Sequence, residues 1–128
     1  MPHVLVVEDD QPIQELLSEV FLLDGFSVST AADGLQALEA VRTRRPDVVV
    51  LDLMLPVMDG HAFLRALRQA VEWATIPVVI VSAVATEVER SRHLAHAWLR
   101  KPFDVDELLL VVWRVIPTEF PTGVAGNS

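Results

Sequence analysis

Apolar and polar positions follow two alternating patterns along the chain, and each change of pattern marks the boundary of an expected element. Continuous apolar runs at His3–Val7, Val48–Leu51 and Pro77–Ser82 are typical of strands that are buried on both faces. Ser27–Ala31 alternates in polarity as an edge strand does, and Trp98–Arg100 is a short fifth strand. The pattern therefore predicts five strands.

A segment with apolar residues at helical spacing follows each of these strands. Asp10 suits the N-cap of the first helix, Pro12 its first turn and Gly25 its end. The five expected helices are Gln11–Asp24, the segments opened by Asp33-Gly34 and Asp59-Gly60, Thr86–Ala97 and Asp104–Ile116.

This alternation of strands and helices predicts an α/β fold with a five-stranded parallel sheet covered by helices on both faces. Crossovers between parallel strands are right-handed, and the expected strand order is 2-1-3-4-5. In that order the chain reverses direction between strands 1 and 3. Ligands of such sheets bind beside this reversal, at the carboxyl ends of the strands.

Composition narrows the class of protein. The 128 residues suffice for one domain, expected at 1–116 with a flexible tail at 117–128. No cysteine, membrane-length apolar run or signal peptide is visible, which favours a cytoplasmic protein without membrane insertion. A net charge of −8 disfavours direct nucleic-acid binding, and the cluster Arg42, Arg44 and Arg45 is interpreted as a helix end.

Polar residues stand where the predicted strands end. Glu8 and Asp9 follow the first strand, Asp52 the third, Ser82 ends the fourth and Lys101 follows the fifth. Each alone is typical of a turn or cap, the role in which we leave Asp10. Together they predict one site at the sheet edge, because strands 1 and 3 are neighbours.

Such a cluster suits a hard divalent cation such as Mg²⁺ or Mn²⁺, which prefers oxygen ligands. A carboxylate is also a nucleophile toward phosphoryl groups, and Asp52 is the candidate. Lys101 would supply positive charge to the phosphoryl oxygens and Ser82 a hydrogen bond.

The motifs "VLVVEDD", "LDLMLPVMDG", "PVVIVSA" and "KPF" together resemble the receiver domain of bacterial two-component response regulators, over nearly all of Pro2–Ile116. The resemblance is to the stand-alone, chemotaxis-regulator-like members and implies a flavodoxin-like fold. It implies that Asp52 is the phosphoacceptor and that Asp9 coordinates the metal directly. Glu8 would act through a metal-bound water, and Met54 through its backbone carbonyl.

The resemblance also implies roles around the phosphoryl group. Ser82 and Lys101 would contact it, Ala83 would leave room for it, and the Lys101–Pro102 bond would be cis. Trp98 occupies the position of the aromatic residue that changes rotamer on phosphorylation, where the family usually has Tyr or Phe.

In function, the resemblance implies a phosphoacceptor that is not an enzyme beyond its own phosphorylation and dephosphorylation. A histidine kinase or phosphotransfer protein would donate the phosphoryl group. The surface of helix 4, strand 5 and helix 5 would then switch toward an unknown downstream protein. The number of residues between Ser82 and Lys101 is smaller than is usual in the family that the sequence resembles, which predicts a shortened or displaced helix 4.

Two other functions remain open at this point. One is a phosphorylation-independent, receiver-like interaction module. The other is a haloacid-dehalogenase-like phosphatase, which needs an acid two residues after its nucleophile, where this chain has Met54.

Weaker signals lie elsewhere. His93 and His96 have a spacing that can bind metal but are interpreted as an exposed helix face, and His61 as a surface residue. The last helix carries a second apolar stripe, formed by Leu109, Trp113 and Ile116. That stripe predicts a homodimer or partner face, a surface covered by Phe120 from the tail, or core packing of a rotated helix.

Overall fold

A computed structural model gives the structure of residues 1–117. The predicted tail, including Phe120, lies outside the described residues except for Pro117. The strands are β1 (His3–Val7), β2 (Ser27–Ala31), β3 (Val48–Asp52), β4 (Val78–Ser82) and β5 (Ala97–Arg100). The α-helices are α1 (Gln11–Leu23), α2 (Gly34–Thr43), α3 (Gly60–Gln69), α4 (Ala85–Ser91) and α5 (Val105–Val115), with short 3₁₀ helices η1 (Val71–Trp73) and η2 (Arg92–Leu94).

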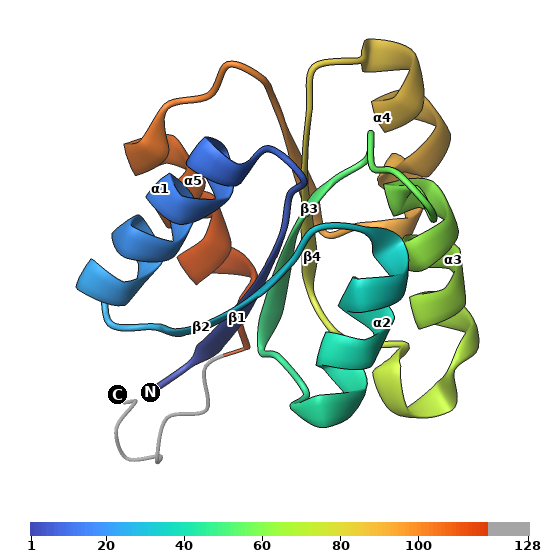
Figure 1. The fold of residues 1–128 in the computed structure, drawn as a ribbon, viewed down its shortest axis with the longest axis horizontal. Helices are drawn as coiled ribbons and strands as arrows, with labels where there is room; N and C mark the ends of the chain where they lie inside the picture. The colour runs from blue at the N-terminus through green and yellow to red at the C-terminus, as the bar shows by residue number, and fades with distance from the viewer. Residues whose placement is uncertain (118–128) are drawn as a thin grey trace.

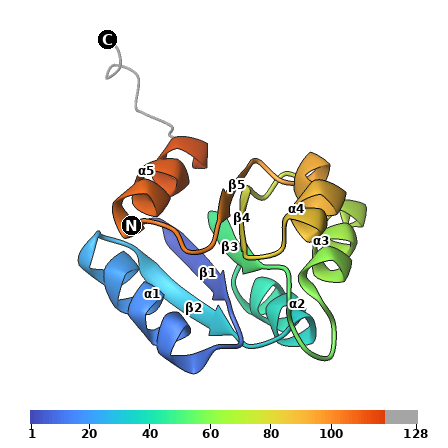
Figure 2. The same cartoon turned by 90° about the horizontal axis from the view of Figure 1, so that it is seen from above.

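All five strands are parallel, in the order β2-β1-β3-β4-β5, so the predicted fold and strand order are confirmed. Helices α1 and α5 cover one face of the sheet, and α2, α3 and α4 cover the other (Figures 1 and 2). Every residue of β1, β3 and β4 is buried, which explains their continuous apolar sequences. None of the helices in residues 1–117 is long and apolar enough to cross a bilayer.

Aspartate side chains cap α1, α2, α3 and α5, whereas α4, with Val84 at its N-cap, has no side-chain cap. Asp10 accepts a hydrogen bond from the backbone N–H of Ile13, as predicted, at the start of α1. Asp33 and Asp59 do the same at the starts of α2 and α3. Each cap satisfies a backbone donor that a helix leaves unpaired in its first turn.

The segment before β5 differs most from its prediction. Helix α4 ends at Ser91, so the expected helix Thr86–Ala97 was too long, whereas the expectation of a short helix here is confirmed. His96 lies after η2, and its backbone N–H donates to the Val78 carbonyl at 2.9 Å. The chain from His96 onward therefore runs along the edge of β4, where it supplies hydrogen-bond partners to backbone groups of β4 that would otherwise be unpaired.

The second apolar stripe of α5 is not a free face. Ile116 is buried in the core, so its assignment to an exposed partner face was wrong. Leu109 packs against the same cluster. Trp113 is partly exposed, but its ring lies 4.6 Å from that of Phe26, and its indole N–H donates to Asp24 at 2.6 Å. The segment between α1 and β2 therefore covers part of this stripe.

Two histidines are buried and bonded to serine hydroxyls. His3 on β1 contacts Ser27 and Ser29 of β2, each at 2.7 Å. His61 was expected at the surface, but it is buried and its Nδ1 lies 2.8 Å from the Ser91 hydroxyl of α4. The prediction was wrong because α4 packs over the first turn of α3, which the sequence pattern of α3 alone does not reveal.

Loss of contact with water disfavours the protonated form of three imidazole rings, those of His3, His61 and His96. The pKa of His3, of His61 and of His96 is lowered below its usual value, in each case mainly by burial and further by a nearby arginine. The native protein therefore holds these rings neutral at a pH where the unfolded chain protonates them.

We predict that the free energy of unfolding decreases as pH falls through about 6.5, because the unfolded chain then binds protons that the native state excludes. Denaturant titration at about pH 7.5 and pH 5.5 measures the decrease. His61→Asn keeps a hydrogen-bonding group beside Ser91 but cannot titrate, so its decrease should be smaller than that of the parent. An equal decrease in both proteins would contradict the assignment.

Candidate functional site

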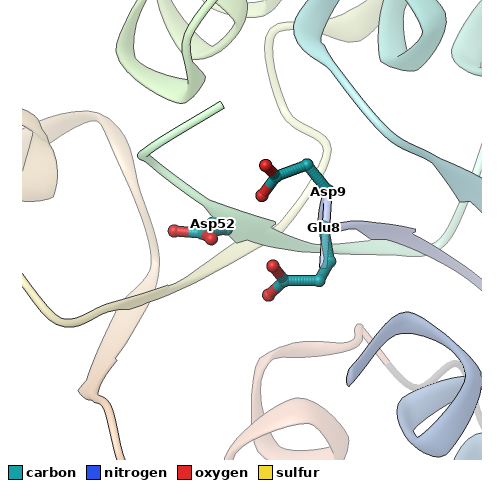
Figure 3. Close-up of side chains that lie close together, drawn as sticks. All are labelled: Glu8, Asp9 and Asp52. Carbon is teal, nitrogen blue, oxygen red and sulfur yellow. The ribbon is translucent and has the colours of Figure 1, made fainter. Parts of the chain in front are cut away.

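Three carboxylates meet where β1 and β3 end side by side. Val7 and Leu51 are paired across these strands, so Glu8 and Asp9 leave β1 at the level where β3 reaches Asp52. One oxygen from each carboxylate lies within 4.8 Å of the others (Figure 3). The predicted convergence of these three residues is therefore present in the fold.

Lys101 joins this cluster from the residue after β5. Its ammonium donates to Glu8 Oε1 at 2.8 Å and to Asp52 Oδ2 at 3.2 Å. The Lys101, Glu8 and Asp52 side chains are only 19%, 2% and 8% exposed, so little water screens these contacts. One ammonium thus holds two carboxylates that would otherwise repel each other.

The pKa values respond to this packing. Burial and then the charge of Asp52 raise the pKa of Glu8, although its hydrogen bond from Lys101 acts in the opposite direction. Burial alone would lower the pKa of Lys101, but the Glu8 hydrogen bond and the Asp52 charge outweigh it and leave the pKa above its usual value. Lys101 therefore remains an ammonium at neutral pH.

The loop between β3 and α3 holds Asp52 in place. The Gly60 backbone N–H donates to the Leu53 carbonyl at 2.9 Å, so α3 begins directly against the end of β3. A Cβ at Gly60 would lie 2.6 Å from the Leu53 Cα and would also contact the Asp52 carbonyl, so only glycine fits. The Met54 backbone N–H donates to Asp52 Oδ1 at 3.1 Å and orients the carboxylate.

Backbone strain in the same loop falls on Val57. This β-branched residue has a φ of 66°, a left-handed conformation that such side chains rarely adopt. Strain of this kind persists only where surrounding contacts impose it, and here the Gly34 and Gly60 backbone hydrogen bonds hold the loop on both sides.

The other predicted site residues lie around the cluster. Ser82 ends β4 fully buried, and its Oγ accepts from the Val84 N–H at 3.2 Å, which leaves its hydroxyl proton free to donate. The Lys101 backbone N–H donates to the Ser82 carbonyl at 2.9 Å, which ties β5 to the end of β4, and the Lys101–Pro102 peptide bond is cis. Ala83 is exposed beside Lys101.

Trp98 is not part of the cluster. It lies on β5 opposite Ile80 and is 45% exposed. A small cavity of about 130 Å³ lies beside it between α4 and β5, lined by Val88 and Arg92 among others.

Sequence reasoning missed one supporting residue. The Gln14 side-chain amide donates to the carbonyls of Glu8 and Ala31, at 2.9 and 3.2 Å, and so ties α1 to the ends of β1 and β2. Helical spacing places Gln14 on α1 but contains no signal that its side chain reaches back to the sheet edge.

The donor set fits a divalent cation. Three ionised carboxylates and one ammonium carry a net charge of −2, and all the candidate ligand atoms are oxygens, which Mg²⁺ prefers. Lys101 stands close enough to share the charge of a group bound to Asp52. The site therefore combines carboxylate oxygens that can hold a cation with an ammonium group beside Asp52.

Comparison with known proteins gives consistent matches. A family described as response regulator receiver domain matches residues 4–112. Transcriptional regulatory protein CseB of Streptomyces avermitilis is 41% identical over 105 residues, which cover 80% of this chain and 43% of that protein. Response regulator MprA of Mycolicibacterium vanbaalenii is 36% identical over 129 residues, which cover 98% of this chain and 55% of that protein.

Solved structures agree with the sequence matches. A sensor protein from Polaromonas sp. JS666 superposes with a TM-score of 0.83 at 37% identity, covering 90% of this chain and 95% of that chain. The chain spans about half the length of the curated relatives it matches.

We predict that Lys101→Met lowers the free energy of unfolding by roughly 3 kcal/mol in metal-free buffer, because it leaves two buried carboxylates without their shared cation. Adding Asp52→Asn to that variant should recover part of the loss, since one of the two charges is removed. Denaturant titration measures both values.

Arg100→Met is the matched control. Arg100 is exposed on β5 next to Lys101, and it makes no ion pair in the part of the chain that the structure describes. Its replacement should change stability by less than about 0.5 kcal/mol. Equal losses in the Lys101 and Arg100 variants would mean that the shared ion pair contributes nothing specific.

Proposed function

The chain belongs to the family of response regulator receiver domains, and from this we propose that it accepts a phosphoryl group on Asp52 and passes the signal to a protein partner. Receiver domains are signalling domains that interact with histidine kinases and bind Mg²⁺ at an acidic pocket. The observation that carries the proposal is the contact of Lys101 with both Glu8 and Asp52 beside the Asp9 carboxylate.

Different residues of the pocket would bind the metal ion and attack the phosphoryl group. Asp9, Asp52 and the Met54 carbonyl would hold Mg²⁺ directly and Glu8 through a water, and the bound ion supplies positive charge to the phosphoryl oxygens. An Asp52 oxygen attacks phosphorus as the bond from phosphorus to the donor's imidazole nitrogen breaks and that nitrogen keeps the electron pair.

Lys101 and Ser82 act on the product. Once Asp52 carries the phosphoryl group as an acyl phosphate, Lys101 can donate to a phosphoryl oxygen in place of Asp52 Oδ2, from which it lies 3.2 Å in this structure. The free hydroxyl proton of Ser82 provides a second donor at the end of β4. Both contacts stabilise negative charge in a site that little water reaches.

A groove beside the pocket suits the phosphodonor protein. Apolar side chains of α1 and of the segment after β5 line a cavity of about 380 Å³ that borders Lys101 and Ala83. Leu16 of α1 is half exposed there. A histidine kinase or phosphotransfer protein seated on this groove would bring its phosphohistidine to Asp52.

Output would pass through α4, β5 and α5. Movement of Ser82 toward the phosphoryl group would free space at the end of β4, and Trp98, on the neighbouring strand, would turn inward from its exposed position. The cavity beside Trp98 and the short α4 offer room for that change. Such a change biases a two-state surface toward its partner.

A phosphorylation-independent interaction module is the second candidate function. It is favoured by Trp98, because an indole is bulkier than the Tyr or Phe expected at this position and its inward state costs more. Both candidates use the same surface, but only the first requires Asp52 chemistry.

We predict that incubation with acetyl phosphate and Mg²⁺ adds one phosphoryl group to the protein and that chelation of Mg²⁺ prevents it, because Asp52 needs the cation to approach a phosphate. Intact-mass spectrometry measures the product. Asp52→Asn should gain nothing.

Asp47→Asn is the control for Asp52→Asn, since Asp47 stands at the opposite end of β3. It should be phosphorylated like the parent. Phosphorylation of the Asp52→Asn variant would reject Asp52 as the acceptor. Absence of phosphorylation in the parent would reject the proposed chemistry and favour the phosphorylation-independent module.

We also predict slow loss of the phosphoryl group, because Met54 and Val84 flank the expected path of an attacking water and neither side chain can orient it. Met54 is about half exposed, so it can be replaced without disturbing the core. Met54→Asn should speed dephosphorylation in Mg²⁺, whereas Met54→Ala should change it little. An asparagine variant no faster than the parent would contradict this explanation.

A further inference from the structure

A second concentration of charge lies between α3 and the α4–η2 segment, and it shares no residue with the carboxylate pocket. It surrounds a cavity of about 350 Å³. The lining residues are His61, Arg65, Arg68, Gln69, Arg90, His93 and Leu94. Three arginines and no acid line this cavity, although the chain as a whole carries a net charge of −8.

Arg68 is held in position without a counter-charge. Its Nε donates to the Leu94 carbonyl at 2.8 Å and one terminal nitrogen to the Ala74 carbonyl at 3.0 Å. The other terminal nitrogen, Nη2, is buried and has no hydrogen-bond partner in residues 1–117. Within that range no carboxylate lies within ion-pair distance of Arg68, so its charge is balanced only by carbonyl dipoles.

Arg65 and Arg90 add to the positive charge around the cavity. Arg65 makes no ion pair within the described residues, and Arg90 meets Glu87 at 3.3 Å. The buried His61 ring responds to both, because after burial itself Arg90 and Arg65 lower its pKa, while Asp59 and Glu87 act in the opposite direction. Its Nδ1 is engaged by Ser91, which holds the ring at the cavity wall.

Arrangements of like charge around a hollow are unfavourable unless an anion completes them. Guanidinium groups are well matched to phosphate, because their planar N–H forks donate in pairs to its oxygens. The cavity volume lies in the range of small-molecule sites, and Arg68 is already fixed before any ligand arrives.

We propose that this cavity binds a small anion carrying phosphate groups, of the size of pyrophosphate or a nucleoside diphosphate, through Arg65, Arg68 and Arg90. Arg68 contributes a fixed positive charge at the cavity wall, and the exposed Arg65 and Arg90 donate to the anion from α3 and α4. An acidic protein segment would offer single carboxylates, which use the forked donors less well than phosphate does.

Isothermal titration with sodium pyrophosphate, in chelator and at constant ionic strength, tests the proposal without Mg²⁺ chemistry at Asp52. The parent should bind with a Kd of about 1 mM or tighter. Arg65→Gln combined with Arg90→Gln should weaken binding about tenfold or more, since each removes a charged donor. These two side chains are exposed, so their loss should leave the fold intact.

Arg114→Gln, on the exposed side of α5, is the matched control and should bind like the parent. ADP binding as tight as pyrophosphate would identify the diphosphate as the recognised group, and tighter ADP binding would add the nucleoside. Equal affinity of the parent and the double arginine variant for pyrophosphate would overturn the proposal. A parent protein that binds a polyglutamate peptide but does not bind pyrophosphate would also overturn it. These outcomes are independent of Asp52 phosphorylation, which is measured separately by mass.

Discussion

One ammonium group shared by two buried carboxylates is the contact on which the site depends. Glu8 and Asp52 come from neighbouring strands and Lys101 from the far side of β4, so their meeting requires the sheet to be complete. The Glu8, Asp52 and Lys101 side chains have little solvent exposure, so their electrostatic attraction is strong and a charge left without its partner would be costly. The same arrangement leaves Asp9 in reach of a cation and Asp52 beside a positive charge, so the chemistry of the pocket follows from how the fold offsets its own repulsion.

Close backbone packing makes that contact possible. The chain must turn immediately after Asp52 and begin α3 against the end of β3, and the space there admits no side chain at Gly60. Strain at Val57 accompanies the tight loop. Gln14 secures the opposite side of the pocket by bonding to the ends of β1 and β2. The pocket is therefore rigid where Asp52 is held, which suits the proposed attack of an Asp52 oxygen on phosphorus.

The contact between α3 and α4 differs from the carboxylate pocket in how its charges are arranged. Between α3 and α4, charge is concentrated rather than cancelled, and the short α4 followed by η2 brings Arg90 and His93 over α3. The short α4 and the following η2 thus supply one wall of the basic cavity, and α3 supplies the other. Binding there would restrain α4, an element of the proposed output surface, without any contact with the carboxylate pocket.

The sequence by itself was sufficient for the parallel sheet, the strand order, the Asp10 cap and the convergence of Glu8, Asp9 and Asp52, because all of these follow from local pattern and from the geometry of parallel strands. Only the tertiary structure revealed the burial of His61 and Ile116, the hydrogen bond from Trp113 to Asp24 and the reach of Gln14 to the sheet edge. These features depend on which helices touch after the sheet has formed. Periodicity records which face of an element is apolar, but it does not record which neighbour will cover that face.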